Sequence, residues 1–307
     1  MTQPKITILG IFVADMAFRA DRQPKTGETL IGRNFALGPG GKGSNQAVAA
    51  GRAGADVTFL TRLGQDPFAE MASKIWSDAN VVGNIRSGPD SYTGAAYIFV
   101  DDQSGENAII VCPGAAMEIA PEDITAWSDQ ITGADIFMTQ LEQPVDSAVQ
   151  ALRLAKDAGV TTIFNPAPAA TLPDEIWPHC DFVTPNETEA SDLTGISVYS
   201  IDSARSAGDR LLQMGAGACL ITLGESGVLV HRAGESEHLH AICHAPVVDT
   251  TGAGDAFNGA FATALGAGQP LIDAARFGCA AAGIAVTRPG TAQSMATLTE
   301  IENALAR

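Results

Sequence analysis

Basic residues are scarce in this sequence. The 307-residue chain carries 18 Lys and Arg against 35 Asp and Glu, a formal net charge of -17. Nucleic acids and anionic membrane surfaces are bound by clustered Lys and Arg, so this deficit argues against both as partners. Any phosphate ligand must therefore be held locally, by main-chain N–H groups and a few basic side chains.

Cysteine pairs and long apolar runs are lacking too. The five cysteines include no C-x-x-C pair, and their odd number does not suggest a disulfide framework, so we expect a reducing, cytoplasmic compartment. No run of about 18 apolar residues exists, so we expect no membrane span. The apolar run from Ile6 to Phe18 is interrupted by Asp15 and preceded only by Lys5, which indicates a buried strand rather than a signal peptide.

Short apolar runs alternate with helical patterns through most of the chain. This alternation predicts an α/β fold with a mostly parallel sheet covered on both faces, which binds ligands beyond the carboxyl ends of its strands. The predicted strands are Ile6–Val13, Val57–Leu60, Asp135–Met138, Thr161–Phe164, Phe182–Thr184 and Cys219–Thr222, and the predicted helices are Asn45–Ala53, Pro67–Ala79, Val145–Ala158, Glu187–Leu193 and Ser203–Met214.

Two segments break this alternation. Thr29–Leu37 and Ala95–Cys112 have strand-like patterns without crossover helices, and the second contains a turn signal at Asp101–Gly105. We predict a small second sheet that acts as a lid, formed by about 14–38 and 93–113 within a single domain of residues 1–307.

The segment Asp249–Gly259 combines glycines with the start of a helix that continues through Leu265. Bare backbone at a helix N-terminus favours an anion, because unpaired N–H groups and the macrodipole act together. Asp255 would lie in the first turn, where it points toward whatever this loop holds. The simpler interpretation is that Asp255 is an ordinary first-turn acid.

A second glycine-rich segment, Gly38–Ala47, leads into an alanine-rich helix. It formally matches G-x-G-x-x-G, but the dinucleotide fingerprint should follow the first strand directly, and the P-loop motif is excluded because Gly43 follows Lys42. Bare backbone here would let a small polar ligand approach, with Lys42 and Asn45 bonding to its hydroxyl groups. An ordinary glycine loop before a helix is the alternative.

With these two segments, the chain resembles the ribokinase or phosphofructokinase-B family of carbohydrate kinases along essentially its whole length. Further motifs carry the likeness: Asn165–Ala169, Thr184–Ala190, Thr222–Gly227 and Ala285–Arg288. The resemblance implies a three-layer sandwich with a small β-sheet lid, and transfer of the ATP γ-phosphate to a sugar hydroxyl with Mg²⁺ and, as an activator, K⁺. D-ribose, giving D-ribose 5-phosphate, is the leading substrate.

The resemblance also implies the phosphate-transfer roles. Asp255 would deprotonate the sugar hydroxyl, while the amides of Gly252, Ala253 and Gly254 form an anion hole; both roles suit a reaction that depends on positioning and electrostatics. Glu189 would organise Mg²⁺ through water. Asn186 and Glu189 also match a helix capping box, and both readings stay open.

Nucleotide and potassium contacts follow from the same resemblance. The ATP-binding residues would be Asn186, Thr222, Gly224, Gly227 and Gly254. The potassium site, formed mostly by main-chain carbonyls, would be Asp249, Thr251, Ala285, Arg288, Gly290 and Ser294.

The sugar contacts implied by the resemblance are Asp15, Gly41, Lys42, Asn45, Glu142 and Asp255. One position departs from the family pattern, because Val13 replaces an asparagine and cannot form a hydrogen bond. A deoxyribose, another furanose-like sugar or a nucleoside is therefore an alternative substrate. Whether Phe12, Met16 and Phe18 edge the sugar site or belong to the core stays open.

Rival interpretations of other features are weaker. His238, His240, Cys243 and His244 lie close enough for a metal site, but their spacing fits no common zinc pattern. A sugar-binding protein without turnover would not need a base such as Asp255 aimed at the phosphate. A homodimer through the lid is the expected assembly.

Overall fold

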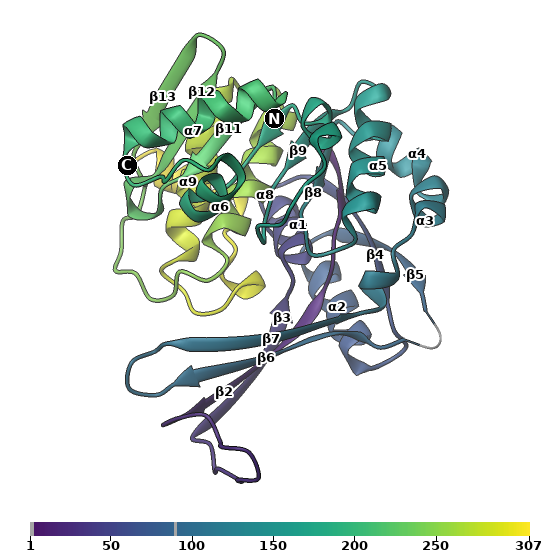
Figure 1. The fold of residues 1–307 in the computed structure, drawn as a ribbon, viewed down its shortest axis with the longest axis vertical. Coiled ribbons are helices and arrows are strands. Elements are labelled where there is room, and N and C mark those ends of the chain that lie inside the picture. Colours follow the sequence, from purple (N-terminus) through teal and green to yellow (C-terminus); the bar gives the residue numbers. More distant parts are fainter. Residues whose placement is uncertain (1–2, 89–90) are drawn as a thin grey trace.

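The computed structural model describes residues 3–88 and 91–307, which form one large and one small β-sheet (Figure 1). The large sheet has nine strands in the order β13-β12-β11-β10-β9-β8-β1-β4-β5, and the small sheet has the order β3-β2-β6-β7. The strands are β1 (Lys5–Leu9), β2 (Val13–Ala20), β3 (Asn34–Gly40), β4 (Asp56–Leu63), β5 (Val81–Ser87), β6 (Thr93–Asp101), β7 (Asn107–Gly114), β8 (Ile136–Thr139), β9 (Thr161–Phe164), β10 (Phe182–Val183), β11 (Ala218–Thr222), β12 (Val228–Arg232) and β13 (Glu235–Leu239).

Seven neighbouring strands of the large sheet, β11 to β5, pair in parallel, whereas β12 and β13 extend one edge as antiparallel strands. Helices cover both faces, as the alternating pattern predicts. The helices are α1 (Lys42–Arg52), α2 (Pro67–Asp78), α3 (Pro121–Ala126), α4 (Ser128–Thr132), α5 (Val145–Asp157), α6 (Glu187–Thr194), α7 (Ile201–Met214), α8 (Ala253–Gly266), α9 (Leu271–Ala285) and α10 (Leu298–Leu305), with 3₁₀ turns at Ala115–Glu118, Asp174–His179, Gly224–Ser226 and Ala292–Ser294.

Successive side chains along each strand point to opposite faces of the large sheet, so the core consists of two apolar layers. Ile8 of β1 packs with α1, α2, α8, α9 and α10 on one face, while the next residue, Leu9, packs with α3, α4, α5, α6 and α7 on the other. Phe137 and Met138 divide in the same way. The predicted three-layer α/β sandwich with a mostly parallel central sheet is thereby confirmed.

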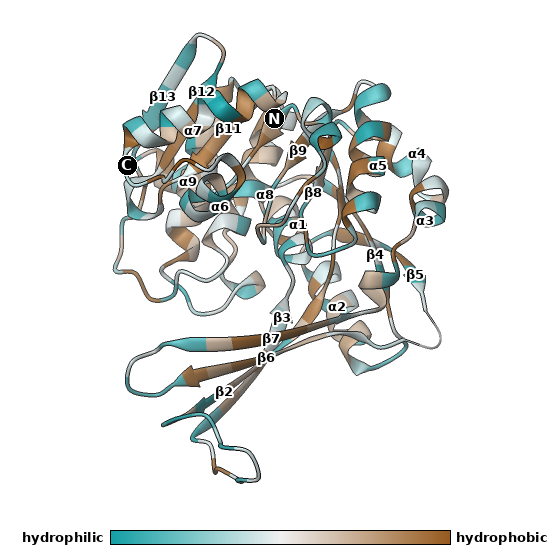
Figure 2. Cartoon of the chain, viewed as in Figure 1, coloured by the Kyte–Doolittle hydropathy of each residue, from teal (hydrophilic) through white to brown (hydrophobic). Residues whose placement is uncertain are grey.

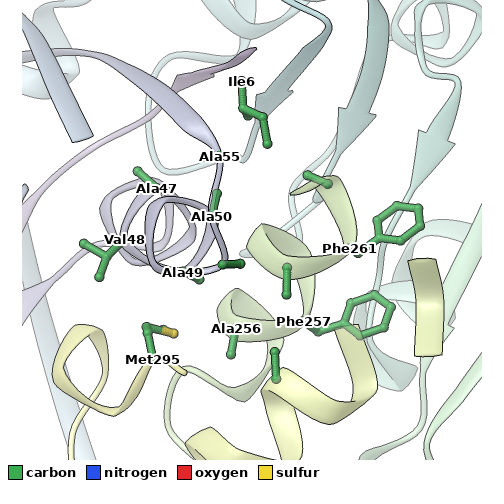
Figure 3. Close-up of a cluster of buried hydrophobic side chains, with 14 of the residues drawn as sticks. Ile6, Ala47, Val48, Ala49, Ala50, Ala55, Ala256, Phe257, Phe261 and Met295 are labelled. Atoms are coloured by element: carbon green, nitrogen blue, oxygen red, sulfur yellow. The ribbon is translucent and has the colours of Figure 1, made fainter. Parts of the chain in front are cut away.

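The α1 and α8 helices pack closely in one of these layers. Figure 3 shows α1, with Ala47, Ala49 and Ala50, beside α8, with Ala256 and Phe257, in one buried apolar cluster. A methyl group placed on Gly259 would lie 2.5 Å from the Gln46 carbonyl oxygen, so glycine permits this approach. The contact matters because the N-terminal turns of both helices carry predicted site residues.

The small sheet projects away from the large one (Figure 1). Its central strands β2 and β6 are parallel, and β3 and β7 flank them in antiparallel fashion. The predicted turn near 101–105 joins β6 to β7 as a hairpin, so residues within 14–38 and 93–113 supply most of this sheet. Figure 2 shows apolar residues along β6 and β7.

Several predicted boundaries were wrong. The run Ile6–Val13 is not one strand: the chain leaves the large sheet after Leu9 and enters the small sheet at Val13. Strand β3 of the small sheet spans Asn34–Gly40 rather than the predicted Thr29–Leu37, because only residues 34–40 pair with β2. Strands β5, β12 and β13 were also missed. Exposed, polar residues interrupt the apolar pattern of β5 and β13, whereas β12 is a short buried run, Val228–Arg232, that was not identified as a strand. In the described part of the chain, no helix has the length and hydropathy needed to cross a bilayer.

Candidate active site

The N-terminus of α8 presents unpaired main-chain donors. Gly252, the N-cap residue, has φ 79°, a left-handed conformation that glycine adopts without strain. The N–H of Ala253 donates to the Thr250 carbonyl at 3.2 Å, whereas those of Gly254 and Asp255 have no acceptor among the described residues. This end of the helix can therefore bind an anion.

Asp255 lies in the first turn of α8, as predicted, with 7% of its surface exposed. Its Oδ2 accepts from Asn45 Nδ2 and its Oδ1 from Gln46 Nε2, both at 3.0 Å. Burial raises the pKa of this carboxyl, while Lys42 and the two amide donors oppose the shift. A buried carboxylate with a raised pKa is a stronger proton acceptor than an exposed one.

Asp15 approaches from β2 and lies against the backbone before α1. A methyl group on Gly40 would lie 2.2 Å from the Asp15 carboxylate, and one on Gly41 would lie 2.5 Å from the Ile11 carbonyl oxygen. Gly40 therefore leaves room for the Asp15 carboxylate, and Gly41 allows the backbone to pass close to Ile11. Burial, together with the nearby charge of Asp255, raises the pKa of Asp15 to about 6.

Lys42 and Glu142 meet at the start of α1. The Lys42 main-chain N–H donates to Glu142 Oε2 at 2.7 Å. Burial raises the pKa of Glu142 to about 7, against the opposing effect of Lys42. Burial would lower the pKa of the Lys42 ammonium, but the carboxylates of Asp255, Glu142 and Glu189 raise it, so this side chain stays charged.

Lys42 and Asp255 also line a cavity of about 540 Å³. It brings together all the predicted nucleotide residues, which are Asn186, Thr222, Gly224, Gly227 and Gly254, and adds apolar residues from two further segments, Val228, Ala241 and Cys243. The Thr222 N–H donates to the Pro185 carbonyl at 3.0 Å, which fixes the two loops side by side. The volume suits a ligand of nucleotide size.

Asn186 and Glu189 form the capping box of α6. The Glu189 N–H donates to Asn186 Oδ1 at 2.8 Å, and the Asn186 N–H donates to Glu189 Oε2 at 2.9 Å. The capping alternative is thus confirmed. Both side chains also line the cavity, and burial raises the pKa of Glu189. Its carboxylate retains lone pairs that can bind water on a hard cation.

The loops predicted to hold potassium are tied together by Asp249. Its Oδ1 accepts from the Thr251 N–H at 2.9 Å and its Oδ2 from the Gly290 N–H at 3.0 Å. Ser294, which is buried, donates to the Thr291 carbonyl at 2.7 Å. The Arg288 side chain instead pairs with Glu300, so only its main chain can serve such a site. Ala285 also offers a carbonyl, which accepts from the Arg288 N–H.

Four of the six predicted sugar residues lie outside the nucleotide cavity. Asp15, Gly41, Asn45 and Glu142 are not among its described lining residues, whereas Lys42 and Asp255 are. Asn45 Oδ1 is buried and has no hydrogen-bond partner among the described residues, so it can accept a bond from a ligand hydroxyl. The site therefore has two halves that meet at Lys42 and Asp255.

The apolar residues around β2 divide between core and surface. Phe12 is buried against Trp76, with ring centroids 5.9 Å apart, and Val13 belongs to the apolar layer that includes Leu9. Phe18 packs on Phe35 in the small sheet and is 41% exposed. Phe12 is thus a core residue, whereas Val13 shares the Asp15 face of its strand.

Of the described His and Cys residues from β13 to the loop before α8, only His238 and His240 are in ring contact, with centroids 4.7 Å apart. His238 bonds to the Ser226 carbonyl, His244 to the Ala304 carbonyl, and Cys243 donates to the Ala245 carbonyl. Among the described residues, no group of three or more His, Cys, Asp or Glu side chains could hold a metal ion.

Buried amides behind Asp255 were missed as site residues. Gln46 contacts Asp255 directly, and Gln140 and Asn165 contact Gln46. Gln46 is a fully buried carboxamide in an alanine-rich helix, and that unusual placement was the available signal.

Comparisons with known proteins agree with this geometry. The model of the pfkB family of carbohydrate kinases matches residues 3–298. The chain is 39% identical to a ribokinase of Haemophilus influenzae over 96% of each chain, and 35% identical to a deoxyribokinase of Salmonella typhi over 84% of each. A structure of Arabidopsis thaliana ribokinase with ribose and ATP superimposes with a TM-score of 0.93 at 30% identity, covering 100% of both chains. The chain therefore belongs to the pfkB family of carbohydrate kinases.

Proposed function

We propose that this carbohydrate kinase transfers the γ-phosphate of ATP to a hydroxyl of D-ribose and forms D-ribose 5-phosphate. The observation that carries the proposal is the position of Asp255, a buried carboxylate in the first turn of α8 between the two halves of the site. Its one side faces the polar residues of the sugar half, and its other side borders the nucleotide cavity.

The proposed roles follow from charge and position. Asp255 takes the proton of the attacking hydroxyl, since burial raises the pKa of its carboxyl while the charge of Lys42 favours the ionised form. The free N–H groups of Gly254 and Asp255 stabilise negative charge on the transferring phosphoryl group. The side-chain oxygens of Asp15 and Asn45 accept hydrogen bonds from sugar hydroxyls and so orient the sugar.

The described residues fit ATP with Mg²⁺. Thr222, Gly224 and Gly227 border the part of the cavity with apolar walls, where a base can lie. Glu189 would hold the metal ion through water, and its raised pKa fits a carboxylate that gains a cation. The ion would neutralise phosphate charge. Carbonyls of the loops joined by Asp249 and Gly290 would bind potassium.

We also propose a cytoplasmic homodimer formed through the small sheet. Its exposed apolar residues support this assembly: Phe35, Ile109, Ile110 and Val111 are 52%, 53%, 62% and 46% exposed. The five cysteines are free, which fits a reducing compartment. Replacing Ile110 with Asp should convert the dimer to a monomer in sedimentation experiments. A wild-type protein that sediments as a monomer at all concentrations would contradict the dimer.

The direct test is ADP release, coupled to a detection system, over a panel of ribose, deoxyribose, other pentoses, hexoses and nucleosides. We expect the highest kcat/KM with ribose, a requirement for Mg²⁺ and stimulation by K⁺. No turnover with any sugar would reject the kinase proposal. Sugar binding in calorimetry without turnover would instead favour a non-catalytic sugar-binding protein.

A second substrate is favoured by one residue. Val13 is buried beside the sugar half, on the strand face of Asp15, and cannot bond to a hydroxyl. A sugar that lacks one hydroxyl, such as deoxyribose, would leave no unpaired hydroxyl beside Val13. One relative of the chain is a deoxyribokinase. A higher kcat/KM for deoxyribose than for ribose in the same panel would support this alternative.

A further inference from the structure

Gln46 lies behind Asp255, on the side away from the nucleotide cavity. Its Nε2 donates to Asp255 Oδ1 at 3.0 Å and to Asn165 Oδ1 at 3.0 Å. Its Oε1 accepts from Gln140 Nε2 at 2.6 Å. Gln46 and Gln140 are fully buried, and neither is among the cavity's described lining residues. They can therefore act on a ligand of this cavity only through packing or through the lining residues that Gln46 contacts, Asp255 and Asn165.

The direction of these bonds is fixed by a main-chain carbonyl. Asn165 Nδ2 donates to the Thr184 carbonyl at 2.7 Å, and a carbonyl oxygen can only accept. Asn165 must therefore turn its own Oδ1 toward Gln46, which then has to present its NH₂ group. The same NH₂ group faces Asp255, so Gln46 is held as a donor to the carboxylate.

A second branch returns to the helix that carries Asp255. Thr184 Oγ1 donates to Asn258 Oδ1 at 2.6 Å, and Asn258 Nδ2 donates to the Gly254 carbonyl at 2.8 Å. The chain of buried amides thus closes on the residue before Asp255. Buried hydrogen-bond networks of this kind rigidify a site, because each member fixes the orientation of the next.

We propose that Gln46 is a positioning residue, which holds the Asp255 carboxylate in a single orientation and stabilises its ionised form, with Gln140 and Asn165 fixing the Gln46 amide. The inference rests on the proposed role of Asp255 as the base. Charged groups face Asp255 from four other segments: Lys42 from α1, Asp15 from β2, Glu142 from the loop after β8, and Glu189 from α6. Three of these four are acidic, so a neutral donor at Oδ1 offsets their effect on the carboxylate.

The test is the pH dependence of turnover in the Gln46→Met variant, which keeps the side-chain length but has no donor. The acidic limb of kcat should move to higher pH, because Asp255 loses a bond that favours its ionised form. We expect kcat to fall about 10- to 100-fold at pH 7, with the difference from wild type narrowing at higher pH, and the KM for ATP to change less than about two-fold. An equal loss of kcat at every pH would overturn the proposal.

The matched control is Gln143→Met. Gln143 is equally buried and donates to Thr139 Oγ1 and the Gln140 carbonyl, with no bond to Asp255. This variant should lower the melting temperature while leaving the acidic limb of the pH profile in place.

If Gln46→Met fails to fold, Gln46→Glu keeps an acceptor for Gln140 and adds a carboxyl group beside Asp255. The acidic limb should then move in the same direction, and an unmoved limb would overturn the proposal.

A second readout does not depend on turnover. In protein labelled with carbon-13 at aspartate carboxyl groups, the Asp255→Asn variant assigns the Asp255 signal. Its titration midpoint should rise in Gln46→Met and stay at the wild-type value in Gln143→Met. An unchanged midpoint in Gln46→Met would reject the positioning role. Lack of sugar kinase activity in the wild type, by contrast, would reject the proposed function and leave this measurement valid.

Discussion

The hydroxyl of Thr291 donates to the main-chain carbonyl of Pro39 across 2.8 Å. This buried bond joins the loop that follows α9 to the last residues of β3 in the small sheet. Pro39 and Gly40 pair with Ala14 and Val13 of β2, next to Asp15. A side chain beside the predicted potassium loop therefore supports the backbone against which Asp15, a predicted sugar contact, rests.

Thr291→Val should weaken sugar binding through this connection. Valine keeps the shape of threonine but leaves the Pro39 carbonyl unpaired, at a cost of about 1–3 kcal/mol in stability. We expect a several-fold higher KM for the sugar and an unchanged KM for ATP, measured by initial rates. Thr125→Val, which removes an exposed bond to the Pro121 carbonyl in α3, is the control. A lower melting temperature with an unchanged sugar KM would limit Thr291 to a structural role.

Asp255→Asn should abolish most turnover while leaving ATP binding intact. Asparagine preserves the shape but cannot take a proton from the sugar hydroxyl, so kcat should fall by at least about 10²-fold. Calorimetric titration with ATP should give a dissociation constant close to that of the wild type. A variant that keeps the wild-type rate would remove Asp255 from its proposed role.

Asp15→Asn should stabilise the sugar-free protein near neutral pH. The pKa of Asp15 rises from 3.8 to about 6 on folding, chiefly through burial, so between these values the folded state holds a proton that the unfolded state has lost. The free energy of unfolding contributed by Asp15 therefore falls as pH rises from about 4 to 7. Asparagine avoids this loss, on the order of 1–3 kcal/mol.

Chemical denaturation at pH 4 and pH 7 measures this difference. The variant should be more stable than wild type at pH 7, with the gap closing toward pH 4, and its affinity for sugar should drop because the amide replaces an acceptor. In the wild type, sugar affinity should itself weaken below about pH 6. A variant less stable than wild type at pH 7 contradicts the assigned cause of the pKa shift.

Val13→Asn should shift selectivity toward ribose. An amide on the Asp15 face of β2 can bond to the additional hydroxyl, which is worth on the order of 1–3 kcal/mol, or about ten-fold or more in relative kcat/KM. The measurement is the ratio of kcat/KM for ribose to that for deoxyribose. Val13→Ala removes apolar bulk without adding a donor and should leave the ratio unchanged. An unaltered ratio in Val13→Asn would place this residue outside sugar recognition.

Patterns among residues close together in the sequence predicted much of the fold and of the candidate site. The glycine-rich start of α8 and the Asn186–Glu189 capping box are set by residues within a few positions of each other, and both lie where the sequence places them. Parallel strands alternating with helices also follow from short-range periodicity. The break between β1 and β2 was missed, because the residues on either side are equally apolar and only their pairing partners, β8 and β6, assign them to different sheets.

The sequence by itself thus determined the fold class and the glycine-rich helix start that carries Asp255, since helix starts, glycine positions and alternating burial are local properties. Only the tertiary structure decided what surrounds Asp255. Asn45 and Gln46 are more than two hundred residues away in the chain, and Gln140 and Asn165 come from other loops. The packing of α1 on α8 brings Asn45 and Gln46 to the carboxylate, and no local pattern encodes that contact.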